Sequence, residues 1–488
     1  MSTSPGEAVA QAGSDRHCDE FHIEAPPPWL AWRVMNLQAC TVRGWLVLAS
    51  ALALPAGAVT TEIGPGDNLQ ASVNTLQPGD ELILRGGTYT LGSRFSIQLL
   101  GTVASPILIR AKDGETPVIV YPNTSQNVIN VESSEYVTVR GLEVTGGSHG
   151  IRISDSDFIT VEDCHIHHTN DVALSANVPG SSYEGLVLRH NHIHDTDNTG
   201  EGMYLGCNYD DCRMFDSLIE GNYIHHTNGP SVSQGDGIEI KEGSFNNVVR
   251  DNVIHDTNYP CILTYSTVGN GRANVIERNL LWGCGDHAIQ SAADAVIRNN
   301  IILGAAQDGI RNQPHQSGVP SNLVITHNTV LAPANSAVRS NSIAGSVVIA
   351  NNALFVQNGD AIRVSGTTSQ LTVVSNAGSG GLTGVSTGFD ASGDIDLDLV
   401  AASYSGQLPQ DVFPGGGSLL VGAASPTYLA FDDFNGLLRQ GSADIGAYHW
   451  NPGGNPGWTL AEEFKELLLI FLEGFESGNL SNWSSSQP

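Results

Sequence analysis

The residues best suited to chemistry lie in and around the stretch GDGIEIKEGSFNN, which begins at Gly235. Asp236 and Glu239 in this stretch, together with Glu201, supply carboxylate oxygens, the hard ligands that Ca²⁺ prefers in proteins. Lys241 follows Glu239 by two residues, in a chain with 21 Lys and Arg against 50 Asp and Glu. A lysine beside a bound cation can have a lowered pKa and act as a general base. We therefore expect a Ca²⁺ site at Glu201, Asp236 and Glu239, with Lys241 as a base next to it.

Other residues could complete such a site. Tyr265 and His287 are candidate proton donors to a leaving group. Tyr204, Arg272 and Arg311 are candidate substrate contacts, because an aromatic ring and guanidinium groups suit an acidic sugar.

Two alternatives use the same charged residues. On an exposed strand, Lys241 would form only weak ion pairs with Glu239 and Asp236. Asp236 paired with Glu201 or Glu239 could instead serve as the two carboxylates of a glycoside hydrolase. The clustered Asp-Asp and Gly-His-Gly motifs of β-helix pectin hydrolases are missing from the sequence, which weakens the hydrolase alternative.

Histidines recur in four successive segments, IHHT, IHDT, IHHT and IHDT. Stacking of these segments would place His167, His194, His225 and His255 in one column, with His168, Asp195, His226 and Asp256 beside it. Stacked His and Asp side chains could bind Zn²⁺ or Cu²⁺. The alternative is a hydrogen-bonded ladder, because a repeat copies its turn chemistry coil by coil.

The elements that must position these residues form a repeat. A unit of apolar, x, x, Asn, x, apolar recurs about every 20–30 residues, as in LRHNHI, IEGNYI, VRDNVI and IERNLL. A second short strand follows each unit, as in EGMYLG and DGIEIK. Such strands bury their apolar face only when successive coils stack. The repeat therefore predicts a parallel β-helix, with Ile238 and Ile240 facing the core and Glu239 and Lys241 facing out.

Superposing the second strands predicts two outward columns. One column contains Arg152, Leu174, Tyr204, Glu239, Leu263, Gln290, Arg311, Arg339 and Arg363, and the other contains Ser154, Ala176, Gly206, Lys241, Tyr265, Ala292 and Gln313. Arg311 would lie three coils from Glu239, about 14 Å away at the usual strand spacing, and Arg272 could reach the cluster only from its loop. The longest coils begin at residues 188, 219 and 249, which places the expected cleft there.

The Asn of each unit predicts a further column: Asn191, Asn222, Asn252, Asn279, Asn300, Asn328 and Asn352. We expect these residues at turns in the left-handed conformation, with side-chain amides bonded from coil to coil.

With these coils, the chain resembles the right-handed parallel β-helix family that includes many polysaccharide lyases. Residues 66–91 look like the family's capping helix and first strand, residues 101–111 like its entry to the coils, and residues 442–450 like a closing segment. The resemblance implies an all-β protein built as a single-stranded right-handed parallel β-helix, or solenoid, with an N-terminal capping helix. The expected parts are a leader (1–58), the cap and first coils (59–130), the β-helix core (131–365), the last coils and closing strand (366–450), and a linker and tail (451–488).

The carboxylates and Lys241 are similar to the calcium-dependent, lysine-base lyases of alginate or chondroitin-type glycans. This resemblance implies β-elimination at uronic acid residues, with Ca²⁺ as cofactor and an acidic polysaccharide as partner. The sequence departs from the lyase pattern, because Glu239 lies only two residues before Lys241, and Leu263 and Tyr265 stand where an arginine is expected one coil later. A non-catalytic protein that binds glycans or lies on the cell envelope is the alternative, since one fold serves many functions.

The formal net charge of -29 argues against nucleic acid as a partner, because phosphate binding depends on clustered Lys and Arg. A polyanionic glycan would need local cations or a bound metal. Export is expected from residues 35–58, which have the parts of a secretory signal, with Met35 as the suspected true start. We expect a secreted, periplasmic or extracellular protein, monomeric and without a membrane span in its mature part. Cys207 and Cys212 are expected to form a disulfide, and the other cysteines after the leader to be small buried side chains, with a zinc site as a weaker option.

Overall fold

A computed structural model describes residues 57–332, 334–439 and 443–466. The predicted leader lies almost wholly outside the described residues, as do residues 467–488 of the predicted tail. In the described residues no helix combines the length and the apolar character needed to cross a bilayer.

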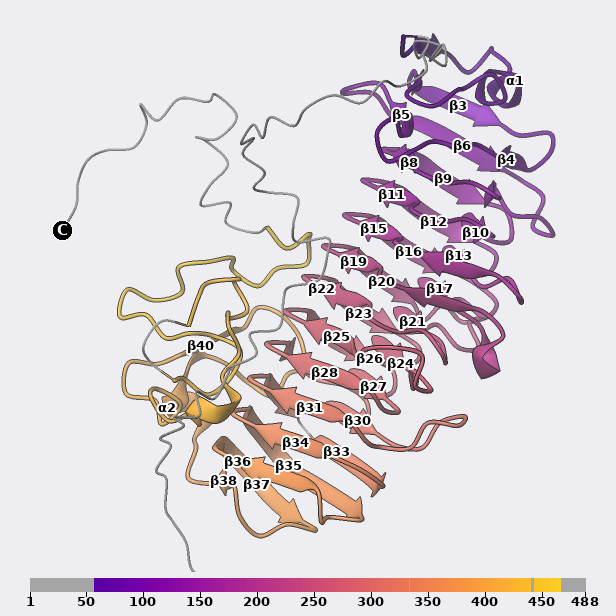
Figure 1. Ribbon diagram of the computed structural model, residues 1–488. Helices are drawn as coiled ribbons and strands as arrows, with labels where there is room; N and C mark the ends of the chain where they lie inside the picture. The colour runs from indigo at the N-terminus through magenta and orange to yellow at the C-terminus, as the bar shows by residue number, and fades with distance from the viewer. Residues whose placement is uncertain (1–56, 333, 440–442, 467–488) are drawn as a thin grey trace, which may run out of the picture. The chain divides into compact units, whose positions relative to one another are not determined.

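The described chain winds into coils whose strands pair in parallel with those of the coils before and after (Figure 1). Three ladders of strands run along the solenoid, and we number them by the order in which a coil passes through them. Ladder 1 is a 13-stranded sheet. Its strands are β1 (Thr60–Ile63), β2 (Glu81–Leu84), β5 (Ile107–Ala111), β8 (Val137–Arg140), β11 (Thr160–Glu162), β15 (Val187–Arg189), β19 (Leu218–Glu220), β22 (Val248–Arg250), β25 (Asn274–Glu277), β28 (Ala295–Arg298), β31 (Leu323–Thr326), β34 (Val347–Ala350) and β36 (Leu371–Val374).

The other two ladders merge near the end of the solenoid, where long strands bend through both. Ladder 2 contains β3 (Gly87–Thr90), β6 (Pro117–Tyr121), β9 (Glu143–Gly146), β12 (His165–Thr169), β16 (His192–Thr196), β20 (Tyr223–Thr227), β23 (Val253–Thr257), β26 (Leu280–Cys284), β29 (Ile301–Ile302) and β32 (Thr329–Ala332). Ladder 3 contains β4 (Phe95–Ile97), β7 (Ile129–Glu132), β10 (Ile151–Ser154), β13 (Leu174–Ala176), β17 (Met203–Leu205), β21 (Ile238–Ile240), β24 (Ile262–Thr264), β27 (Ile289–Ser291), β30 (Ile310–Asn312) and β33 (Asn335–Ile343). Both ladders continue into β35 (Ala353–Gly366) and β37 (Asn376–Thr383), and β38 (Phe389–Asp390) pairs with β37. The predicted all-β parallel solenoid is confirmed.

The Asn column is confirmed as a hydrogen-bonded ladder, but its backbone conformation was predicted wrongly. From Asn222 on, each buried Asn accepts bonds from the backbone N–H and the amide of the Asn one coil earlier, as Asn279 does from Asn252 at 3.0 and 2.9 Å. Asn191, the first of the column, accepts from Cys164 N–H at 3.1 Å. The ladder ends one coil later than predicted, at Asn376. The left-handed conformation belongs to the residue before each Asn, such as Arg278 with φ 57°. Turning the chain at that residue leaves the Asn side chain pointing inward, where it satisfies backbone groups of adjacent coils.

The outward columns of ladder 3 follow the predicted register except at β13. Tyr204 pairs with Glu239, Glu239 with Leu263, and the column continues to Arg311 as predicted. On β13, however, Ser175 stands in register between Arg152 and Tyr204, while Leu174 and Ala176 are buried in the core. The predicted register of β13 was therefore wrong by one residue. Because successive residues of a strand point to opposite faces, this shift exchanged its outward and core residues.

Segments outside the coils cover the N-terminal end of the solenoid and part of the outward face of ladder 2. At the N-terminal end lies the short helix α1 (Leu69–Val73), which buries Leu69 and Val73 and begins at Asn68, whose side chain caps Ala71 N–H. After the last coil, residues 395–439 and 443–466 carry α2 (Ile395–Asp398), β39 (Leu399–Ala401) and β40 (Asp411–Pro414), and lie beside ladder 2 (Figure 1). This segment packs Phe413, Phe434 and Tyr448 against outward apolar side chains of ladder 2. Trp458 and Leu460, in the region expected to be a linker, are buried in the same cluster.

Two disulfides join cysteines of the coils. The predicted pair, Cys207 and Cys212, is present. Cys261 and Cys284 form a second disulfide and are not the separate buried side chains that we expected. They come from adjacent coils, so that only the three-dimensional register brings them together. Cys164 is buried as a free thiol, as expected.

Candidate functional site

The carboxylate cluster is built on ladder 3 where β17 and β21 stack. Glu201 and Asp236 each precede their strand by two residues, and the pairing of Met203 with Ile238 puts them in register on adjacent coils. Glu239 lies on β21 itself. One oxygen from each of the three carboxylates lies within 4.8 Å of the others. All three side chains are buried, so this is no solvent-exposed strand of weak ion pairs.

Lys241 joins the cluster through Glu239 and Tyr265. Its Nζ donates to Glu239 Oε1 and, at 3.2 Å, to the Tyr265 hydroxyl, which itself donates to Glu239 Oε1 at 3.1 Å. The Tyr204 ring centroid lies 4.5 Å from Nζ, within the range of a cation–π contact. Gly206 precedes Lys241 by one coil, and a Cβ there would come 3.1 Å from the Lys241 Cβ and 2.7 Å from Ser244 Oγ. Gly206, with φ 89°, therefore gives the lysine its space.

Five oxygens of the cluster are buried without a hydrogen-bond donor: both of Glu201, both of Asp236, and Oε2 of Glu239. Burial raises the pKa of the Glu201 carboxyl to about 6, and the Glu239 carboxylate adds to the shift. The pKa of Asp236 is raised well above its usual value, first by burial and then by Glu239 and Glu201. Unpaired buried anions are costly, and a cation that accepts several oxygen ligands removes that cost. The three acidic residues therefore fit a divalent cation of the hard class.

The lowered pKa of Lys241 beside a bound cation stays a prediction, because the protein groups alone raise the pKa of this lysine. Burial acts to lower the pKa of its ammonium, but the Glu239 carboxylate and the hydroxyls of Tyr265 and Tyr204 together leave it raised. Burial, followed by the charge of Glu239, raises the pKa of Tyr265 as well. In this arrangement the lysine is protonated and paired, because Glu239 is its nearest counter-ion.

A wall beside the cluster includes a histidine that the sequence analysis missed. Residues 313–319 form a loop that folds back over β24, and the ring of His315 meets the Tyr265 ring edge-on at 4.5 Å. The loop is held by Ser317 N–H, which donates to Glu242 Oε1 at 2.9 Å, and by Gln316, which donates to Asn208 of the Cys207–Cys212 loop at 2.7 Å. The sequence offered one signal of this loop, which is coil length. The coil from Ile297 to Ile325 is slightly longer than the coil beginning at Val249, which had been counted among the longest.

His149 was also missed, on the other side of the cluster. Its Nδ1 lies 2.8 Å from Ser175 Oγ, in the column that leads to Tyr204. Asp171 lies 3.8 Å from His149 Nε2 and accepts a bond from Thr199, two residues before Glu201. Burial lowers the pKa of His149 to about 4, against the opposing charge of Asp171. A single histidine in a turn gave no sequence signal of this contact.

Three predicted residues belong to other surroundings. His287 is buried, accepts a bond from Asp308 N–H at 3.1 Å, and lies between Asp286 and Asp308. Arg311 donates to the same Asp308 at 2.8 Å, so that His287 and Arg311 form a separate cluster farther along ladder 3. Arg272 is exposed, and its backbone carbonyl accepts a bond from Asn246 N–H at 3.0 Å. The structure thus joins Lys241, Tyr265 and Tyr204 to the carboxylates and gives the other three different partners.

The predicted histidine column is present on the outward face of ladder 2. His167 pairs with His194, His194 with His225, and His225 with His255. The residues beside them, at 168, 195, 226 and 256, have φ between 50° and 52°, which turns the chain after each histidine. His165 and His192 form a second outward column, which the sequence analysis did not identify.

Comparisons with known proteins agree with this architecture. The family model described as "Pel9A-like, right handed beta helix region" matches residues 55–211, and the one described as "Right handed beta helix region" matches residues 180–377. Pectate lyase PEL9 of Emericella nidulans is 24% identical over 303 residues, which are 54% of this chain and 68% of that protein.

Solved structures also resemble the chain. The complex of XylC with xylose has a TM-score of 0.53 at 12% identity and covers 84% of this chain and 99% of its own. The crystal structure of pectate lyase Pel9A has a TM-score of 0.47 at 16% identity and covers 81% of this chain and 97% of its own. The chain has the fold of a right-handed parallel β-helix, as its resemblance to that family implied.

Proposed function

We propose that this protein is a polysaccharide-acting enzyme, specifically a Ca²⁺-assisted lyase that cleaves uronate-containing glycans by β-elimination. The observation that carries the proposal is the group of five buried carboxylate oxygens without a donor, next to a lysine and two tyrosines. The similarity to a pectate lyase supports a uronate as the substrate. Because the sequence relative described above is a pectate lyase, polygalacturonate is the first glycan to test, ahead of alginate and chondroitin.

Charge balance supports a divalent ion at Glu201, Asp236 and Glu239. These three carboxylates and the Lys241 ammonium carry a net charge of −2 when all are ionised, since −3 and +1 are combined. One Ca²⁺ would neutralise the group. When bound, it would offset the charge of the substrate carboxylate and make the proton on the adjacent carbon more acidic.

The chain's own residues would carry out the proton transfers. With a cation held by the three carboxylates, Glu239 would hold the lysine proton less strongly and the pKa of Lys241 would be lower, so that Nζ could accept the C5 proton. The electrons of the C5–H bond form a C4–C5 double bond as the C4–O bond breaks. Tyr265, which hydrogen-bonds to Lys241, is placed to give its proton to the departing oxygen. The Tyr204 ring offers a face on which a sugar can stack.

The burial of Lys241, which is only 4% exposed, supports a second candidate function. A buried ammonium paired with Glu239 would suit a non-catalytic glycan-binding protein in which the ion holds two coils together. We also infer that the protein is exported, from the signal predicted at residues 35–58, and that it acts as a monomer.

The two functions differ in their product. We expect polygalacturonate, alginate or chondroitin to yield the ultraviolet absorbance of an unsaturated uronate in the presence of Ca²⁺, and to yield none after chelation. Lys241→Ala should abolish the signal, whereas Lys112→Ala, at a lysine paired with Glu62 near the N-terminal end, should retain it. Full activity of Lys241→Ala, or no product from any uronate, would refute the lyase. Glycan binding without product would then support the binding protein.

A further inference from the structure

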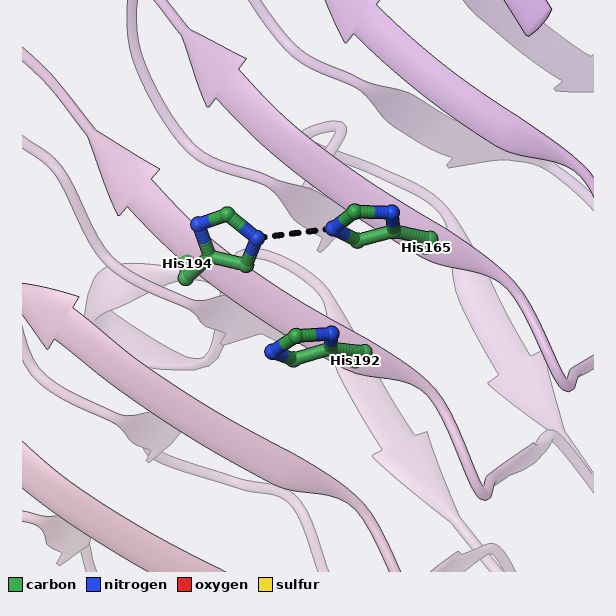
Figure 2. A group of neighbouring side chains, drawn as sticks. All are labelled: His165, His192 and His194. Atoms are coloured by element: carbon green, nitrogen blue, oxygen red, sulfur yellow. Dashed lines mark hydrogen bonds between the residues drawn. The ribbon is translucent and has the colours of Figure 1, made fainter. Parts of the chain in front are cut away.

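Three imidazoles converge on the outward face of ladder 2, away from the carboxylate cluster on ladder 3. His165 lies on β12, and His192 and His194 lie on β16 of the next coil (Figure 2). Their ring centroids are 4.6–4.9 Å apart. One nitrogen from each ring lies within 4.8 Å of the others. The rings are partly exposed, so that an ion could reach them from solvent.

Hydrogen bonds aim ring nitrogens of His165 and His194 into this group, whereas Nε2 of His192 faces His225 of the next coil at 2.8 Å. His194 Nδ1 lies 2.7 Å from Asp195 Oδ2, a contact in which the ring nitrogen donates. The Nε2 of His194 therefore carries a lone pair, and it lies 2.7 Å from the Nε2 of His165. A carboxylate behind a histidine is the arrangement that fixes the tautomer of metal-binding histidines.

Two of the three rings, those of His165 and His192, are neutral near pH 7, as metal ligands must be. Burial, together with the charges of His167 and His194, lowers the pKa of His165 to about 4. Burial lowers the pKa of His192 to about 4 in the same way, with contributions from His194 and His165.

We propose that His165, His192 and His194 bind a transition-metal ion of the Zn²⁺ or Cu²⁺ class. Imidazole nitrogen suits these ions, whereas the three carboxylates on ladder 3 suit a hard ion such as Ca²⁺. Tetrahedral zinc holds two nitrogens about 3.3 Å apart, given bonds of 2.0–2.1 Å. The Nε2 atoms of His165 and His194 would need to separate by roughly 0.6 Å, a small rotation for side chains on a strand surface. Water would complete the coordination on the open side.

A ladder of hydrogen bonds does not by itself explain this group. Similar diagonal contacts continue along the face, from His192 to His225 at 2.8 Å and from Tyr223 to His255 at 3.0 Å. However, the outward column that holds His165 and His192 continues with Tyr223 and then Val253. Of the four coils from β12 to β23, only the first two carry histidine at both outward positions of the strand.

The test uses full-length protein without a histidine tag, stripped of metal by a chelator and desalted. Calorimetric titration with Zn²⁺, together with metal analysis after dialysis, should show one bound ion. His165→Gln and His194→Gln should each weaken binding at least tenfold. His190→Gln, at an exposed histidine two residues before His192 and bonded to Asp163 of the preceding coil, should leave binding unchanged, and so should Glu239→Gln. Equal Zn²⁺ affinity in all four variants would overturn the proposal.

A spectroscopic measurement on the unaltered protein covers the case in which a variant fails to fold. Cu²⁺ added at one equivalent should give an electron paramagnetic resonance spectrum with hyperfine splitting from imidazole nitrogens. A tenfold excess of Ca²⁺ should leave this spectrum unchanged, since Ca²⁺ prefers oxygen ligands. A spectrum with oxygen ligands alone, or loss of the nitrogen splitting on addition of Ca²⁺, would overturn the proposal independently of any variant.

Discussion

At the scale of single residues, Glu239 serves two partners that compete. Its Oε1 accepts bonds from Lys241 and Tyr265, while its Oε2 is buried without a donor beside Glu201 and Asp236. A cation held by these carboxylates would draw on the same negative charge that holds the lysine proton. Occupancy of the proposed site and basicity of Lys241 would therefore be coupled through one side chain.

This coupling predicts that a lysine variant will separate activity from ion binding. Lys241→Met keeps the length of the side chain but removes its charge, so we expect lyase activity to fall by about 10²–10⁴-fold. Ca²⁺ affinity should stay equal or increase, because the ammonium no longer competes for Glu239. Initial rates on polygalacturonate and calorimetric Ca²⁺ titration measure the two effects. A parallel loss of both would contradict the assignment of Lys241 as the base.

Glu201 predicts how Ca²⁺ binding depends on pH. Burial raises the pKa of its carboxyl to about 6, so below that pH a proton competes with the ion for the same oxygens. We expect Ca²⁺ to raise the thermal unfolding midpoint clearly near about pH 7.5 and much less near about pH 5. Glu201→Gln should lose most of the increase at both pH values, whereas Glu115→Gln, at an exposed glutamate near the N-terminal end, should behave as the unaltered protein does. An increase of equal size at both pH values would argue against a site made of these carboxylates.

At the scale of elements, the Asn ladder ties the coils together. Asn279 accepts from the backbone and amide of Asn252, and its own amide donates to Asn300 Oδ1 at 2.9 Å and to Val249 O at 3.0 Å. Each buried Asn thus satisfies groups on the coils before and after it, which a side chain without polar atoms cannot do.

Removal of one rung should destabilise the solenoid measurably. Asn279→Ala leaves several buried groups without partners, so we expect the free energy of unfolding to fall by about 2–4 kcal/mol. Denaturant unfolding followed by circular dichroism measures the change. The matched control is Asn123→Ala, at an exposed loop position, which should change stability by less than about 0.5 kcal/mol. Equal stability of the two variants would show that the ladder adds little to the fold.

The sequence predicted elements better than contacts between loops. The spacing of the Asn units was enough to place the coils and, with the alternation of strands, to align Glu239, Lys241 and Tyr265. The predicted register was wrong by one residue at β13, where Ser175 and not Leu174 lies in the outward column. The spacing could not find His315, His149 or the Cys261–Cys284 disulfide, because turns and loops of differing length bring these residues to their partners. The periodic pattern carries no information on such contacts.

At the scale of the whole molecule, the face of ladder 2 changes character along the solenoid. Its outward residues are histidines on β12 and β16, and they become apolar at Leu280, Ile301 and Phe355. Residues 395–439 and 443–466 cover the apolar part, and Phe464 of this segment reaches back to the rings of His190 and His192. Polar contacts secure the edge, including the amide of Asn351, which donates to the carbonyls of Ser425 and Tyr428 at 3.1 Å.

His327, which lies under this segment, predicts that the packing weakens in acid. It is buried, its Nε2 lies 3.1 Å from the Asn351 amide, and burial together with the charge of Arg439 lowers its pKa well below the usual value. The unfolded chain therefore binds more protons than the folded chain at pH values below about 6.5, so stability is lost as the pH falls. We expect the thermal midpoint of chelator-treated protein to fall between about pH 7 and pH 5, and to fall less in His327→Gln. The control His168→Gln, at an exposed histidine on β12, should retain the full dependence. The same slope in all three proteins would show that protonation of His327 does not govern this packing.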